Sequence, residues 1–194
     1  MNDFRQELSQ EELKEYPVRK FEGEIFLVDS ISKLPAALSE MAEYSVLGFD
    51  TETRPAFRKG VKNKVALLQL ASHDKAWLFR LNMIGLPDSL KSFLSKQTII
   101  KPGVAIHDDI KGLNDWNSFK PGGFVELQDM VKDYGIVSSG LKKLSAIVLG
   151  FAISKRQQVT NWENSSLSDA QLAYAATDAW VCLQIYDYLL NGKA

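Results

Sequence analysis

The sequence has a single cysteine, no excess of one charge and no long apolar run, and each absence excludes a class of protein. Cys182 is alone among 194 residues, so it forms no internal disulfide, and its apolar neighbours predict a buried, unreactive thiol. The 23 basic residues nearly match the 24 acidic ones, so no strong long-range field attracts a polyanion. No stretch approaches the ~18 apolar residues of a membrane span, and the charged N-terminus lacks a signal-peptide core. We therefore expect a soluble, cytoplasmic protein with no membrane partner.

The composition predicts one globular domain. The chain is 45% hydrophobic and 10% aromatic, and a chain of this length buries about 70% of its unfolded surface. This excludes a disordered class and a class that depends on disulfides. Residues 1–21 are polar and contain Pro17, so we expect a loosely ordered arm with room for one short helix. Residues 22–194 are expected to form the domain.

Apolar periodicity predicts a mixed sheet covered by helices. Strands are predicted at residues 24–28, 45–52, 65–70, 76–79, 98–106 and 124–127, and the third and fourth form a hairpin around residues 72–75. Helices are predicted up to residue 44 and over residues 86–94, 109–116, 141–149 and 168–190. Ser168 and Gln171 fit a capping box at the start of the last helix. Strands in the first half and helices interleaved later indicate an α/β fold.

Two acidic side chains follow the apolar part of the second predicted strand. Asp50 and Glu52 are two positions apart, so on an extended backbone they project from one face at a spacing of about 6.6 Å. Taken alone, the pair is explained as a solvated strand end.

Two further acidic clusters lie downstream. Asp108 and Asp109 lie where a predicted strand gives way to a helix, and a carboxylate there caps the helix or gains from its dipole. Tyr174 and Asp178 are one turn apart on one face of the last helix, among alanines that let another element approach closely. An aspartate in so apolar a stretch is costly to bury unless it is paired or bound to a metal. Otherwise Asp178 lies at the edge of the exposed face of the helix.

The three clusters together predict a metal site. Magnesium and manganese prefer oxygen ligands, and four carboxylates are enough to hold two such ions. Two divalent ions about 3.5–4 Å apart can clamp the attacking and leaving oxygens of an in-line phosphoryl displacement. This chemistry requires neither a cysteine nor a phosphate-binding glycine loop.

The order of these acids resembles the DEDD 3′–5′ exonucleases. The similarity rests on DTE at 50–52, on an aspartate of GVAIHDDIKGL at 103–113 and on YAATD at 174–178. The tyrosine four residues before the last aspartate resembles the DEDDy branch, which includes ribonuclease D and the Werner-type exonuclease domain. The segments TRPAFRKG, SGLKKLSAIVLG and KRQQVTNWENSSLSDAQLAYAATDA are similar to the Werner-type subgroup as well.

This resemblance implies a ribonuclease H-like fold with a central mixed five-stranded sheet, and room for one further short strand. It also implies a metal-dependent enzyme that hydrolyses phosphodiester bonds from nucleic-acid 3′ ends and releases nucleoside 5′-monophosphates. By position in the motifs, two divalent ions, magnesium or manganese, would be held by Asp50, Glu52, Asp109 and Asp178.

The resemblance also distinguishes the two neighbouring aspartates. Asp109 follows the apolar Ile106 by three residues, as the family pattern requires, and this favours Asp109 as the metal ligand. Asp108 is then the candidate for the helix cap.

Tyr174 is implied to orient the attacking water. A free phenol has a pKa of about 10 and is a poor base near neutrality, and a metal ion that lowers the pKa of water makes a strong base unnecessary. In the sister DEDDh branch a histidine lies five residues before the last aspartate, where this sequence has Ala173. We therefore expect His73 and His107 to be structural or solvent-facing.

The predicted partner is the 3′ end of DNA or RNA, single-stranded or recessed, and protein partners are left open. Phosphate contacts are predicted from a locally basic rim, which comprises Arg54, Arg58, Lys59, Lys155 and Arg156. Trp162 has two interpretations that the sequence leaves open. It either stacks on a base or packs against the start of the last helix.

A catalytically silent nucleic-acid-binding or partner-binding module with the same fold is the main alternative. The presence of all four acids together with Tyr174 speaks against it. A phosphatase with Asp50 as nucleophile is a weaker alternative, because it gives no role to Tyr174 and Asp178.

Overall fold

The computed structural model describes residues 4–56, 60 and 62–192, and its main sheet has four strands. In spatial order these are β1 (Glu24–Val28), β4 (Lys75–Arg80), β3 (Val65–Ala71) and β2 (Gly48–Thr53). β1 runs parallel to β4, whereas β3 is antiparallel to both β4 and β2. The predicted hairpin and the mixed sheet are confirmed.

The prediction of five strands in one sheet is wrong. β5 (Lys101–Gly103) and β6 (Phe124–Glu126) form a separate parallel pair, which an isolated bridge between Val46 and Ile100 links to the start of β2. In this bridge the Leu47 N–H donates to the Ile100 carbonyl at 2.9 Å, and the Ile100 N–H donates to the Ser45 carbonyl at 2.8 Å. A regular parallel ladder would next use the N–H of residue 102, and Pro102 has none. The sheet is therefore interrupted between β2 and β5.

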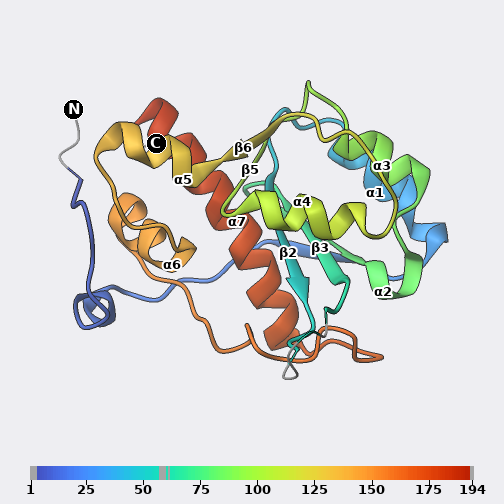
Figure 1. Ribbon diagram of the computed structural model, residues 1–194, viewed down its shortest axis with the longest axis horizontal. Coiled ribbons are helices and arrows are strands. Elements are labelled where there is room, and N and C mark those ends of the chain that lie inside the picture. The colour runs from blue at the N-terminus through green and yellow to red at the C-terminus, as the bar shows by residue number, and fades with distance from the viewer. Residues whose placement is uncertain (1–3, 57–59, 61, 193–194) are drawn as a thin grey trace.

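Helices cover both faces of the main sheet (Figure 1). In chain order they are η1 (Glu12–Glu15), η2 (Ile31–Lys33), α1 (Leu34–Met41), α2 (Leu81–Ile84), α3 (Asp88–Leu94), α4 (Ile106–Asn114), α5 (Leu127–Met130), η3 (Val131–Tyr134), α6 (Leu141–Leu144), the π-helical turn η4 (Ser145–Leu149) and α7 (Asp169–Asn191). Apolar side chains of α1, α3 and α4 pack on one face of the sheet, and α7 packs on the other.

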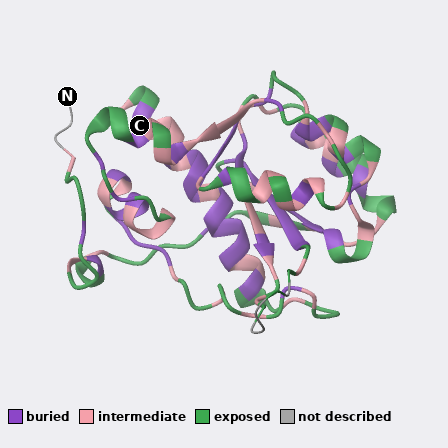
Figure 2. Ribbon diagram, viewed as in Figure 1, coloured by how far each residue is buried: buried purple, intermediate pink, exposed green. Residues whose placement is uncertain are grey.

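The long helix α7 begins as the sequence predicts. The Gln171 N–H donates to Ser168 Oγ at 3.3 Å, and the Ser168 N–H donates to Gln171 Oε1 at 3.1 Å, so the capping box is confirmed. Most of the helix is buried where it crosses the sheet (Figure 2), and Cys182 lies in that buried stretch as predicted.

Alternate residues of β2 face the two sides of the sheet. Phe49 points into the apolar cluster beneath α1 and α3, so Asp50 and Glu52 point toward α7. Gly48 also faces α7, and a Cβ at this position would lie 1.9 Å from the carbonyl oxygen of Ala179. A glycine is therefore required for the close approach of α7 to β2.

The N-terminal residues pack against the body of the protein, so the expectation of a loosely ordered arm is wrong for residues 4–21. Leu8 and Leu13 are buried against Ala146 and Ala152, and the predicted short helix is present as η1. Among the described residues, no helix combines the length and the apolarity needed to cross a membrane.

Candidate active site

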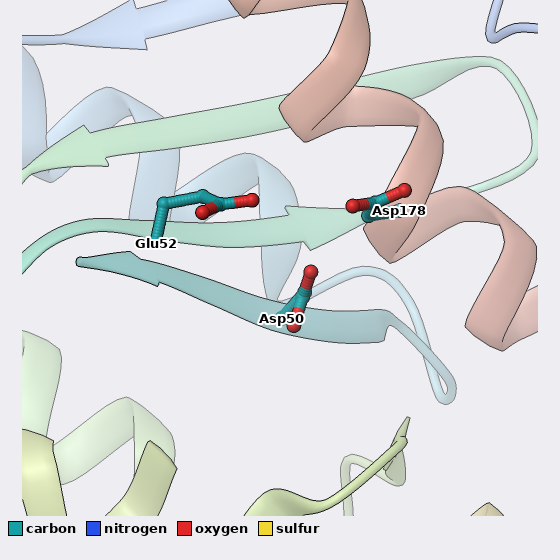
Figure 3. Close-up of side chains that lie close together, drawn as sticks. All are labelled: Asp50, Glu52 and Asp178. Carbon is teal, nitrogen blue, oxygen red and sulfur yellow. The ribbon is translucent and has the colours of Figure 1, made fainter. Parts of the chain in front are cut away.

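Three carboxylates from β2 and α7 converge on one point. Asp50 and Glu52 project from alternate positions of β2, and Asp178 approaches them from the facing side of α7 (Figure 3). One oxygen from each of the three lies within 4.8 Å of the others. The close contact of Gly48 with α7 makes this distance possible, because the two backbones meet without an intervening side chain.

The convergent carboxylates are largely removed from water. Asp178 is 6% exposed and Glu52 is 8% exposed, while Asp50 is partly covered. The Oδ1 atom of Asp178 is buried and has no hydrogen-bond partner among the described residues. A buried carboxylate oxygen without a partner is costly, and three convergent oxygens are the donor set that a hard divalent cation prefers. These residues therefore fit a divalent metal ion.

The pKa values of the three carboxyl groups reflect the same crowding. Burial is the main cause that raises the pKa of Asp50 well above its usual range, and the nearby Asp178 carboxylate is the second. Burial also raises the pKa of Glu52 to about 9 and that of Asp178 to about 7, although the charge of Lys155 opposes the shift of Asp178. A cation among these groups would favour their ionised forms.

Asp109 lies at the rim of this cluster, in the first turn of α4. The Thr51 hydroxyl donates a hydrogen bond to Asp109 Oδ1 at 2.5 Å, and Thr51 lies between Asp50 and Glu52 in β2. Burial raises the pKa of Asp109 to about 6, and its charge contributes to the raised pKa of both Asp50 and Glu52. Asp109 thus belongs to the same electrostatic unit, although it is not one of the three convergent carboxylates.

The prediction that Asp108 caps α4 is wrong. Asp108 is exposed, and the helix begins at Ile106 after Ala105, whose φ of 59° lies in the left-handed region. The carboxylate of Glu126 accepts hydrogen bonds from the N–H groups of Ala105 at 3.1 Å and Ile106 at 2.9 Å. Glu126 therefore caps α4 from β6, a contact between distant segments that local sequence does not reveal.

Tyr174 lies beside Asp178 and is 8% exposed. Burial raises the pKa of its phenol above the ordinary value, and the Asp178 carboxylate, which accepts a hydrogen bond from it, acts in the same direction. The phenol is thus protonated near neutrality and is a hydrogen-bond donor in the site. Its ring lies 6.0 Å from that of Trp162, centre to centre.

Trp162 packs in the interior. Its side chain is 0% exposed and lies with Tyr174 and Leu78 between α7 and the sheet. This favours the packing interpretation over base stacking, which requires an uncovered ring face.

The predicted basic rim is only partly gathered around the site. Lys155 and Arg156 are exposed, and Lys155 acts electrostatically on Asp178. Arg54 is engaged by Glu163, with 3.1 Å between Nη1 and Oε2. Arg58 and Lys59 lie outside the described residues.

Sequence reasoning missed three polar residues around the site: Thr51, Gln69 and Glu126. Gln69 is 0% exposed and directly opposite Asp50 in the β2–β3 ladder, and its amide has no partner among the described residues. The sequence signal that could have found Gln69 is a glutamine inside the otherwise apolar run Val65–Ala71. Of the two histidines, His107 is exposed, and His73 contacts Asp187 at 3.0 Å.

Comparison with known proteins identifies the family. Residues 25–192 match the family model described as 3′–5′ exonuclease. The chain belongs to the 3′–5′ exonuclease family. This confirms the resemblance that the acidic motifs indicate.

Individual members of the exonuclease family show how much of each protein is shared. The mouse bifunctional 3′–5′ exonuclease/ATP-dependent helicase WRN is 35% identical over 158 residues, which are 78% of this chain and 11% of that protein. The crystal structure of the Nibbler EXO domain from Aedes aegypti is 27% identical, with a TM-score of 0.79 over 91% of this chain and 92% of that one. A Trypanosoma brucei RNase D in complex with RNA U12 shares the fold, at 22% identity and a TM-score of 0.77, over 89% and 64% of the two chains.

Proposed function

We propose that this chain is a metal-dependent 3′–5′ exonuclease that hydrolyses the terminal phosphodiester bond of a nucleic acid and releases nucleoside 5′-monophosphates. The single observation that carries the proposal is the convergence of Asp50, Glu52 and Asp178, with one buried oxygen of Asp178 that has no hydrogen-bond partner among the described residues. The family membership of the chain supports the reaction type.

The carboxylates have distinct proposed roles in this reaction. When bound, two magnesium or manganese ions would activate water and neutralise charge on the phosphate oxygens. Asp50, Glu52 and Asp178 would hold the first ion. Asp109 would hold the second together with Asp50, since its hydrogen bond from Thr51 occupies Oδ1 and leaves Oδ2 for a ligand.

Tyr174 has a positioning role in the proposal. Its protonated phenol donates to Asp178, so it fixes the orientation of that carboxylate and can align a water beside it. A phenol with a raised pKa does not accept a proton from water near neutrality. Removal of the Tyr174 hydroxyl is therefore expected to impair the alignment of the water rather than metal binding.

The proposed substrate is a nucleic-acid strand with a free 3′ end. The RNA-bound RNase D of similar fold supports a nucleic-acid substrate. Lys155 lies within electrostatic reach of Asp178, where it would attract the phosphate backbone.

A digestion panel tests the proposal. Single-stranded DNA, recessed duplex DNA and RNA, each labelled at the 5′ end, are incubated with magnesium or manganese, and product lengths are resolved. We expect ladders that shorten one nucleotide at a time and that disappear with a chelator. Asp178→Asn should abolish the ladder, whereas Asp187→Asn on the same helix, and Asp108→Asn beside Asp109, should keep it. Tight strand binding without cleavage under every condition would instead identify a catalytically silent binding module.

A further inference from the structure

A small polar pocket lies between the N-terminal arm and α6. It has a volume of about 310 Å³, and Ser138, Lys142, Lys143 and Lys155 lie in its wall, opposite Glu7 and Gln10 of the N-terminal arm. Lys155 connects the pocket to the candidate active site, because its charge acts on Asp178. Lys155 thus belongs both to the wall of the pocket and to the electrostatic surroundings of Asp178.

Ser138 supplies an unused polar group in this pocket. The residue is 6% exposed, and its hydroxyl has no hydrogen-bond partner in the part of the chain that the structure describes. Its backbone N–H, by contrast, donates to the Gln6 carbonyl at 3.2 Å. A buried hydroxyl without a partner costs stability unless a ligand satisfies it.

The charges around the pocket favour an anion. Neither Lys142 nor Lys155 forms an ion pair with a described residue, and Lys143 makes only a long contact with Glu7, at 3.5 Å between Nζ and Oε1. Three lysines and one glutamate therefore line the pocket. Lysine is a point-charge binder of phosphate, and a serine hydroxyl can donate to a phosphate oxygen.

We propose that Ser138, Lys142 and Lys143 form a subsite for a backbone phosphate of the nucleic-acid strand, upstream of the bond at the carboxylates. This inference rests on the proposed exonuclease function. If the 3′-terminal bond lies at Asp50 and Asp178, all other phosphates of the strand lie on its 5′ side, so a second phosphate site must hold the upstream part. Lys155 lines the pocket and also acts electrostatically on Asp178. The pocket would set a minimum strand length for tight binding.

Binding of two strand lengths tests the subsite in the full chain. A fluorescent octanucleotide and a dinucleotide are titrated in chelating buffer, where hydrolysis does not proceed, and anisotropy is measured. We expect Lys142→Ala/Lys143→Ala to weaken octanucleotide binding about tenfold and dinucleotide binding less than about twofold. For octanucleotide binding by this double variant, the slope of log affinity against log salt should become shallower by about 0.7, the contribution of one phosphate contact on a single strand.

The matched control is Lys33→Ala/Lys91→Ala, which removes the same charge from the opposite side of the sheet. It should leave both affinities within about twofold of the original protein. Equal losses for both double variants, or equal losses for both strand lengths, would overturn the subsite.

Ser138→Ala separates a ligand-binding hydroxyl from a merely buried one. We expect an unchanged or raised melting temperature, because an unsatisfied group is removed, together with about threefold weaker octanucleotide binding. Unchanged octanucleotide affinity would overturn the place of Ser138 in the subsite.

Inorganic phosphate, titrated alone, distinguishes a strand site from a site for the free anion. Binding of phosphate that depends on Lys142 and Lys143, with no effect of their substitution on the octanucleotide, would overturn the strand proposal. Failure of the proposed function looks different: the octanucleotide would bind through Lys142 and Lys143 but would never be shortened when metal is added.

Discussion

The two faces of the four-stranded sheet are made from the same strands but hold opposite chemistry. On one face Phe49 and its neighbours pack under α1 and α3 in an apolar cluster. On the other face Asp50 and Glu52 meet Asp178 of α7, and the amide of Gln69 beside them has no partner within the described part of the chain. Both faces bury apolar side chains that stabilise the fold, but the second face also buries carboxylates, which costs stability. The buried carboxylates destabilise the metal-free fold, and a bound cation would offset this cost.

The largest expected effect is that of a substitution on the face that carries Asp50, Glu52 and Asp178, the acidic face. This substitution should change activity without lowering stability. Asp50→Asn should lower kcat/KM by about a thousandfold, since loss of a metal ligand removes several kcal/mol of charge stabilisation. In a chelator the same variant should melt no lower than the original protein, because a neutral group replaces a buried, repelled carboxyl. Steady-state kinetics and thermal denaturation measure the two effects. A fall of less than tenfold in kcat/KM would remove Asp50 from the catalytic set.

The neighbouring residue, Phe49, should behave in the opposite way, because its substitution should lower stability. Phe49→Ala is expected to cost about 3–5 kcal/mol of unfolding free energy, because it empties a fully buried site. The lost ring packs edge-on against Phe124 at 5.0 Å. Denaturant unfolding measures the cost, and Phe26→Ala, at a residue that is 37% exposed, is the control with a smaller loss. Equal losses at both positions would contradict the distinction between the two environments.

The pH dependence of the metal-free protein should come from the acidic face. The folded-state pKa values of Glu52, about 9, and Asp178, about 7, lie above the ordinary 4.5 and 3.8. Between the ordinary and raised values the folded chain binds more protons than the unfolded chain, so the free energy of unfolding falls as pH rises from about 5 to about 8.

Melting temperatures in a chelator across this range measure the pH dependence. The double variant Glu52→Gln/Asp178→Asn should flatten it, and added magnesium should restore stability at the high-pH end. A metal-free protein that is most stable at high pH would show that the carboxyl groups are not crowded as described.

The smallest expected effect concerns Gln69. Gln69→Met should raise the free energy of unfolding by about 1 kcal/mol, because a buried amide that no described residue bonds is replaced by an apolar group of similar length. Leu70→Met, on the apolar face of the same strand, is the control and should cost less than about 1.5 kcal/mol. Destabilisation by the Gln69 change would indicate that its amide is bonded within the folded protein.

Much of the fold and of the site follows from local pattern. The β-prone runs, the capping box and the order of the acids each depend on neighbours in sequence, and they predicted the strands, α7 and the three convergent carboxylates. Pro102 was a visible sign against a long strand over residues 98–106, because proline cannot donate to a ladder. The cap on α4 and the burial of Trp162 depend on segments distant in sequence, and no local pattern encodes them.

The contact between Gly48 and Ala179 also constrains when the site can exist during synthesis. Asp50 and Glu52 leave the ribosome long before Asp178, and contacts between such distant segments form late because loop closure must precede them. Until α7 has been made and has docked on β2, the carboxylates of Asp50 and Glu52 lie at an open strand end and bind a cation only weakly. The convergent carboxylate site is therefore absent from the nascent chain until α7 has formed and docked.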